Sequence, residues 1–217
     1  MSSKKGAAKH DPARSKKLRK RSYNLPEFAR DLLELAPHLP AGLASIRGTS
    51  ALLREEVFLA VAKKNGCRYC TYIHEGFAAY AGASDEEIAT LEGAPLHHFD
   101  RKRWIAVQYA VASLGGRIDP HLKSEAKKHY SKEDLAQLEA LARAMNLSSL
   151  CGNTVDSLLW RLSGKPGARR GASAAEELFI ALLAAPIGGP ALLASAVLKA
   201  GGRLRLPGLR REIRPAP

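Results

Sequence analysis

Gly66-Cys67-Arg68-Tyr69-Cys70-Thr71-Tyr72-Ile73-His74 is the stretch from which the rest of the chain is best understood. It places two of the three cysteines in a C-x-x-C spacing and a histidine four residues after the second cysteine. No proline interrupts the residues that follow, and Gly82 supplies a stop signal, so we predict a helix over about 68–81. Cys67, Cys70 and His74 then lie at i, i+3 and i+7, which is one face of that helix.

The start of a helix favours a thiolate, because the macrodipole stabilises negative charge there and lowers the pKa of a thiol. Cys70 has His74 one helical turn away, where the imidazole can accept or share the thiol proton. Cys67 is three residues from Cys70 and can close a disulfide once Cys70 is oxidised. These residue types at this spacing predict a redox-active dithiol.

The charge of the chain is concentrated at its two ends. The 217 residues are 46% apolar and 25% charged, which are ordinary values for a globular protein, and they carry a net charge of +13. Residues 1–22 hold nine Lys or Arg and one Asp, residues 199–217 hold six and one Glu, and the residues between hold 19 charges of each sign. A neutral body does not fit a nucleic-acid-binding domain, so we expect no nucleic-acid partner.

The distribution of charge and apolar residues predicts three segments. Residues 1–22 contain a single large aliphatic residue, Leu18, and are predicted to be a disordered basic tail. Residues 23–200 form one helical domain, and residues 201–217 form a second basic tail. The basic start is not followed by the apolar stretch of a secretory signal, and three cysteines do not make a secreted disulfide framework. We therefore expect a cytoplasmic protein.

The hydrophobic pattern predicts helices throughout and no strand. Helix-start signals recur along the chain: Asn24 before Pro26, Thr49 or Ser50, Ser84 with Glu87, Asp100, Asp119 before Pro120, Ser131 with Asp134, and Ser173 with Glu176. The pattern favours one helix that starts at Ser131 and runs past Met145, and a separate helix over 153–162. The sequence therefore predicts an all-α, multi-helix bundle.

Leu178–Leu198 is a run of 21 residues without a charge. Its length alone would permit a membrane span. Pro186 and Pro190 flank two glycines at its centre, and we therefore expect two short buried helices joined by a turn, and no membrane partner. Such apolar surface is predicted to be covered by a neighbouring subunit in a homo-oligomer.

Glu55, followed by Cys67, Cys70 and His74, resembles the E-x11-C-x-x-C-x-x-x-H signature of the alkyl hydroperoxidase D-like (AhpD-like) family, within the carboxymuconolactone decarboxylase superfamily. The likeness runs from about Thr49 to Leu114 and is general in helix pattern beyond that. It implies an all-α AhpD-like bundle that assembles as a homo-oligomer, commonly a dimer, trimer or hexamer.

The resemblance also implies a thiol-dependent peroxidase without a bound cofactor. In that reading Cys70 reacts with the peroxide substrate, Cys67 resolves the sulfenic acid, and His74 and Glu55 relay protons. The thiol reductant is then a lipoyl group or a thioredoxin-like protein. Well-known members of the family carry a histidine immediately before the second cysteine, where this chain has Tyr69.

Two other interpretations of the chain stay open at this point. Cys67 and Cys70 could belong to a structural zinc site completed by His97 and His98. The chain could be a non-catalytic helical oligomer that binds an acidic partner through its basic tails. The third cysteine, Cys151, is expected to be a small buried core residue.

Overall fold

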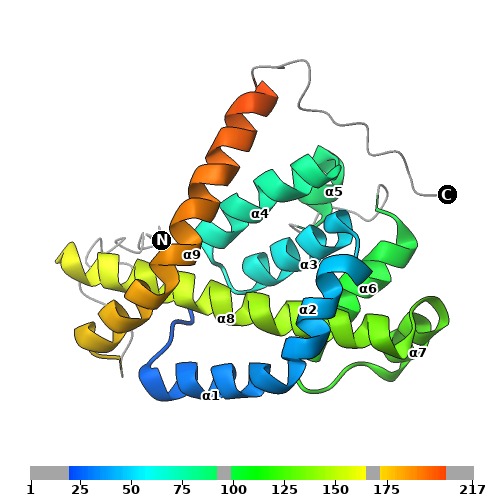
Figure 1. The fold of residues 1–217 in the computed structure, drawn as a ribbon, viewed down its shortest axis with the longest axis horizontal. Coiled ribbons are helices and arrows are strands. Elements are labelled where there is room, and N and C mark those ends of the chain that lie inside the picture. The colour runs from blue at the N-terminus through cyan, green and yellow to red at the C-terminus, as the bar shows by residue number, and fades with distance from the viewer. Residues whose placement is uncertain (1–19, 92–98, 165–171, 204–217) are drawn as a thin grey trace, which may run out of the picture.

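The computed structural model describes residues 20–91, 99–164 and 172–203, and within these ranges the chain is helical without a strand (Figure 1). The prediction of an all-α protein is therefore confirmed. The elements are α1 (Leu25–Leu35), the 3-10 turn η1 (Ala36–His38), α2 (Leu39–Gly48), α3 (Ala51–Lys64), α4 (Arg68–Ala81), α5 (Asp85–Thr90), α6 (Arg101–Ser113), α7 (Pro120–His129), α8 (Lys132–Leu162) and α9 (Ala174–Arg203).

Local capping explains where most of the helices begin. The Asn24 side chain accepts a hydrogen bond from the backbone N–H of Glu27 at the start of α1. Ser84 and Glu87 form a reciprocal capping box at α5, as the sequence predicts. Gly82 ends α4 with a φ of +108°, a left-handed conformation that glycine adopts without a steric penalty.

The long helix α8 runs through the molecule, and the other helices pack around it (Figure 1). The antiparallel pair α3–α4 and helix α6 lie against it on one side, α1 and α2 contact it elsewhere, and α9 crosses both α8 and α4. The main core forms where α3, α4, α6 and α8 meet. Its fully buried residues include Val57, Val61, Ala62, Cys67, Ala106, Val107, Ala110 and Ala142.

Helix α8 corrects the prediction of two separate helices in this part of the chain. It is continuous over 31 residues from Lys132 to Leu162, and Gly152 lies within it. Buried residues occur along its whole length, so tertiary contacts on both sides of Gly152 hold the helix together. The weak helix propensity of this central stretch is overridden by packing.

Helix α9 corrects a second prediction, that of two short buried helices. It continues for 30 residues through Pro186 and Pro190. Buried positions on either side of the prolines, Ile180 and Ser195, fix both halves to the body of the protein. Most of its large apolar side chains are exposed instead of buried. Among the described residues, Ala174–Gly201 is one helix whose length and mean hydropathy of 1.9 would suit a membrane span, and 11% of that apolar window is buried.

The N-terminal boundary of the folded body lies earlier than the predicted residue 23. Ser22 and Tyr23 are fully buried, and the Tyr23 backbone N–H donates to the Thr154 hydroxyl over 2.9 Å. The Lys20 ammonium group lies 3.1 Å from the Asp156 carboxylate. Residues 20–22 therefore belong to the folded body, while residues 1–19 of the predicted tail and residues 204–217 lie outside the described ranges.

Candidate redox site

The turn between α3 and α4 sets the position of the C-x-x-C pair. Gly66 has a φ of +65°, which a residue with a side chain rarely adopts, and it reverses the chain so that α4 packs back along α3. The Asn65 side-chain amide donates to the side-chain oxygen of Asn146 over 3.0 Å and to the Ser149 hydroxyl over 2.6 Å, both on α8. These two hydrogen bonds therefore fix the turn to the central helix α8.

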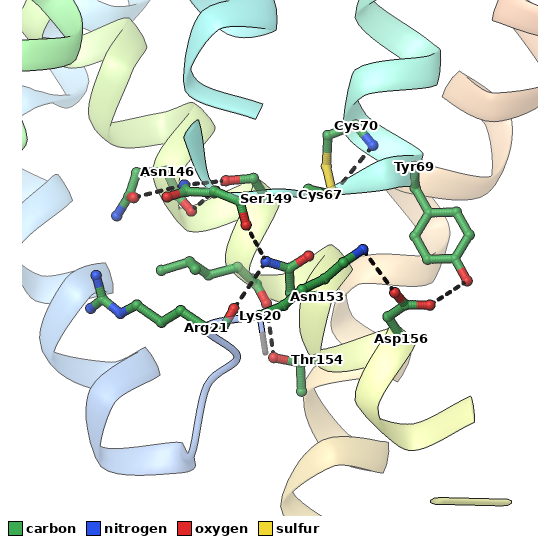
Figure 2. The surroundings of a disulfide bond; sticks show 12 residues. Lys20, Arg21, Cys67, Tyr69, Cys70, Asn146, Ser149, Asn153, Thr154 and Asp156 are labelled. Carbon is green, nitrogen blue, oxygen red and sulfur yellow. Dashed lines mark hydrogen bonds and ion pairs between the residues drawn. A yellow bond between two sulfur atoms is a disulfide. The ribbon is translucent and has the colours of Figure 1, made fainter. Parts of the chain in front are cut away.

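A second asparagine ties the same turn to the N-terminal segment. The Asn153 side-chain amide donates to the backbone carbonyl of Asn65 over 2.8 Å and to that of Arg21 over 2.9 Å. In Figure 2 the Asn153 side chain lies below the disulfide, and Asn146 and Ser149 lie to its left. Asn153 is 1% exposed, so these hydrogen bonds are shielded from water. They hold the backbone of the turn against α8.

Cys67 and Cys70 form a disulfide at the start of α4, with 5.4 Å between their Cα atoms (Figure 2). Cys67 is the N-cap residue, and its sulfur accepts a hydrogen bond from the Cys70 backbone N–H over 3.3 Å. Cys67 is fully buried and Cys70 is 6% exposed. Cys70 is therefore the more exposed of two largely buried residues, and the helix N-terminus favours negative charge on either sulfur in the reduced state.

His74 and Glu55 meet across the α3–α4 interface, with 2.7 Å between His74 Nδ1 and Glu55 Oε2. Both side chains are largely buried, at 14% and 12% exposure. The Phe58 and Phe77 rings pack edge-on against the imidazole, with centroid separations of 5.0 and 6.1 Å. The contact orients the imidazole ring, and a proton on Nδ1 that is shared with the carboxylate would leave Nε2 free to exchange a proton.

Gly152 of α8 lies directly against the disulfide, and sequence reasoning did not single it out. A Cβ atom at this position would lie 2.7 Å from the Cys67 sulfur and 3.2 Å from the Cys70 sulfur. Both distances are too short for nonbonded carbon and sulfur atoms, so the absence of a side chain is what allows α8 to pass beneath the pair. Nothing local in the sequence around Gly152 indicates this contact, because its partners are more than 80 residues away.

Tyr69, which lies between the two cysteines in the sequence, contacts Asp156 of α8. Its ring points away from the sulfurs toward Asp156 (Figure 2), and its hydroxyl lies 3.3 Å from a carboxylate oxygen of Asp156. Arg68 donates to the Tyr69 hydroxyl over 2.7 Å and also pairs with Asp156. Lys20 adds a second cation to the same carboxylate. This cluster fastens the first turn of α4 to α8 and to the N-terminal segment, without contacting the sulfurs.

Glu56, adjacent to Glu55, is fully buried and faces helix α6 instead of His74. The Arg103 guanidinium bridges Glu56 and Glu87, which connects α3, α6 and α5. Burial raises the pKa of Glu56 to about 7, and the positive charge of Arg103 opposes the rise only in part. The Oε2 atom of Glu56 has no hydrogen-bond partner among the described residues.

Two hollows lie near the site. One, of about 800 Å³, runs along the face of α4 that carries Arg68, Thr71 and Glu75, and neither cysteine is among its lining residues. The other, of about 410 Å³, is bordered by apolar residues of α2 and α8 and reaches Phe58, whose ring contacts His74. The second hollow is thus separated from the His74 imidazole by one aromatic ring.

Cys151, His97 and His98 are the remaining candidate residues. Cys151 is a buried free cysteine, as predicted, and its burial raises the pKa of the thiol to about 12, so it is protonated at neutral pH. His97 and His98, named for the zinc alternative, lie outside the described residues. Among the residues that are described, no group of three or more His, Cys, Asp or Glu is arranged to hold a metal ion.

Comparison of the chain with protein-family models, with curated proteins and with solved structures finds no match. The function is therefore argued from the site itself.

Proposed function

We propose that this protein is a thiol-dependent peroxidase that acts on hydroperoxides, or more broadly a thiol–disulfide oxidoreductase. One observation carries the proposal: the Cys67–Cys70 pair lies at the N-terminus of α4, on the helix whose His74 meets Glu55 at 2.7 Å. A dithiol, a helix N-terminus and an oriented imidazole are the groups that two-electron reduction of a peroxide requires.

In the first step the Cys70 thiol loses its proton to His74, and the thiolate attacks the terminal oxygen of the hydroperoxide. The O–O bond breaks, Cys70 becomes a sulfenic acid, and the leaving alkoxide takes the proton from His74 and departs as an alcohol. Glu55 stabilises the imidazolium that exists between these two proton transfers. Cys70 suits this role because it is the more exposed residue of the two.

In the second step the sulfur of Cys67 attacks the sulfur of Cys70. The S–O bond breaks, hydroxide leaves with the thiol proton as water, and the disulfide forms. A dithiol donor then returns two electrons and two protons by thiol–disulfide exchange. A lipoyl group and a thioredoxin-like protein are the two donor classes that we propose, and the cycle uses no bound cofactor.

The proposed setting is a cytoplasmic homo-oligomer. The cycle needs a compartment whose thiol pool can reduce the disulfide, which the cytoplasm supplies. Most of the exposed large apolar side chains lie on α9 and on α1–α2, and we propose that neighbouring subunits cover them.

The test is peroxide consumption by the purified protein with organic hydroperoxide and with hydrogen peroxide, each with dihydrolipoamide or a thioredoxin system as the donor. Cys70→Ser should abolish the fast reaction with peroxide. Cys67→Ser should react once and leave a sulfenic acid on Cys70 that dimedone traps. His74→Ala should slow the first step by on the order of 100-fold.

Three outcomes would change the proposal. If Cys67→Ser loses the fast phase and Cys70→Ser keeps it, the two cysteines exchange roles. If both variants keep it, the pair is not the peroxide site. Stoichiometric zinc in the reduced protein would favour the structural zinc interpretation, and inactivity with affinity for acidic proteins would favour the non-catalytic one.

A further inference from the structure

The smaller of the two hollows, with a volume of about 410 Å³, is bordered by residues of α2, α3 and α8. Helix α2 contributes Leu39, Leu43 and Ile46 to its wall, and α8 contributes Ala140 and Leu141. The three α2 side chains are 53% to 69% exposed, so they present apolar surface to a molecule that enters the hollow. Its volume lies in the range of pockets that bury a small apolar ligand.

The polar groups of this hollow are few, and they are donors. Among the described residues that line it, three carry polar side chains and none is acidic. Ser45 is 1% exposed, and its hydroxyl already donates to the backbone carbonyl of Gly42 over 2.6 Å. Arg54 and His38 are therefore the groups that can donate to a ligand. Apolar walls with cationic donors and no carboxylate favour a ligand that combines an apolar chain with an anionic head.

The Arg54 guanidinium has unused hydrogen-bond donors. It pairs with the Glu55 carboxylate, but Arg54 Nε and Glu55 Oε1 are 3.8 Å apart, which is longer than a hydrogen bond. No other group in the described ranges accepts a hydrogen bond from this guanidinium. The Arg54 side chain is only 26% exposed, so its charge is partly withdrawn from water. The paired N–H groups of an arginine match the two oxygens of a carboxylate, which would satisfy these donors.

We propose that this hollow binds an acyl-chain carboxylate, a molecule of the fatty-acid class, with its chain against the apolar residues of α2 and α8 and its carboxylate on Arg54. The site is separate from the proposed peroxidase reaction, because it uses neither cysteine. It is nevertheless close to the redox pair: Glu55, next to Arg54, contacts His74, and Phe58 borders the hollow and packs against the His74 ring.

Isothermal titration calorimetry of the full chain with decanoate and with 1-decanol tests the proposal. Decanoate should saturate one site per chain, and decanol, which keeps the chain but lacks the charge, should bind at least about 10-fold more weakly. Arg54→Gln should weaken decanoate binding by about 10-fold or more and leave decanol binding unchanged. Arg47→Gln, at an exposed position of α2 that does not line the hollow, is the matched control and should bind decanoate as the wild type does.

A second variant checks that the ligand occupies the hollow itself. Gly42 lies on its wall, and a Cβ atom there would be at an ordinary 3.8 Å from Ala140. Helix α2 therefore accepts a side chain at this position, and the remaining atoms of a leucine would take up space in the hollow. Gly42→Leu should weaken the binding of both decanoate and decanol by at least about 10-fold. Circular dichroism of every variant checks that it is folded.

Four results would overturn the proposal. If the folded wild type does not bind decanoate, the hollow is not a site for this class of ligand. Equal affinities for decanoate and decanol, both unchanged in Arg54→Gln, would exclude recognition of the carboxylate. Equal losses in Arg54→Gln and Arg47→Gln would mean that only the overall positive charge attracts the ligand. Binding that survives Gly42→Leu would place the ligand elsewhere on the chain. Peroxide turnover is measured separately, so a protein that binds decanoate but reduces no peroxide would contradict the peroxidase proposal alone.

Discussion

Glu55 and Glu56 are neighbours in the sequence, but the structure gives them different partners. Glu55 binds His74, whereas Glu56 binds Arg103. The α3 helix separates adjacent side chains by about 100°, so one faces the C-x-x-C helix and the other faces α6. The pair therefore offers a matched comparison between a carboxylate at the redox site and a carboxylate in the framework.

We expect Glu55→Gln to lower kcat/KM for peroxide by on the order of 10- to 100-fold, because the amide can still accept a hydrogen bond but cannot stabilise an imidazolium. Stopped-flow measurement of the first reaction with peroxide checks this expectation. Glu56→Gln is the control and should leave that rate nearly unchanged, because Glu56 pairs with Arg103 and not with His74. Equal losses in the two variants would mean that Glu55 acts only through folding.

At the scale of elements, the contact of α8 with the start of α4 depends on Gly152. An alanine in a helix is favoured over glycine by about 1 kcal/mol when nothing obstructs it. At Gly152 the added methyl group would collide with the Cys67 sulfur. We expect Gly152→Ala to destabilise the oxidised protein by about 1–3 kcal/mol in urea unfolding, as overpacking does elsewhere.

Two further variants isolate this contact. Gly42→Ala in α2 is the control, because its new Cβ would lie at an ordinary 3.8 Å from Ala140. In a Cys67→Ala background the nearest sulfur is gone, so the cost of Gly152→Ala should shrink, and a double-mutant cycle measures the difference. An unchanged cost in that background would show that the methyl group acts through something other than the sulfur.

The contribution of the N-terminal segment to folding stability can also be measured separately. Deleting residues 1–19 should leave the melting temperature nearly unchanged, because this part is rich in Lys, Arg and Ser and has little apolar surface to bury. Deleting residues 1–22 should cost about 1–3 kcal/mol, because it removes the Lys20–Asp156 pair and the carbonyl of Arg21 that Asn153 donates to. Identical melting curves for the two truncations would contradict the docking of residues 20–22.

At the scale of the whole molecule, the burial of Glu56 links folding stability to pH. The pKa of Glu56 is raised to about 7 in the folded protein, so between about pH 4.5 and pH 7 the folded state binds more protons than the unfolded state. The stability that this group contributes is thus complete below about pH 4.5 and is lost as the pH rises toward 7. The difference amounts to about 3 kcal/mol.

Urea unfolding of wild type and Glu56→Gln between pH 4.5 and 8 tests this linkage. Histidines and other carboxylates titrate in both proteins, so the difference between the two curves isolates Glu56. Wild type should lose stability relative to the variant as the pH rises, and the two curves should separate most between pH 5 and 7. Curves that stay parallel over this range would show that Glu56 is ionised throughout in the folded state.

The amino-acid sequence determined the features that depend on neighbouring residues. The helix over 68–81, its stop at Gly82, and the caps at Asn24, Ser84 and Asp100 were predictable because the hydrogen bonds that define them span only a few residues. The spacing of Cys67, Cys70 and His74 likewise follows from the helical repeat. The pairing of Glu55 with His74 was expected only through a family resemblance, and the structure brings the two side chains together.

Tertiary structure alone decided the rest, because the partners are distant in the sequence. Gly152 matters only where α8 passes under sulfurs more than 80 residues earlier in the chain. The continuity of α9 through two prolines depends on burial of Ile180 and Ser195 against other helices, whose contacts offset the local cost of each proline. Local propensity could not show which face of α9 packs against the body of the protein, and that choice leaves most of its large apolar side chains exposed.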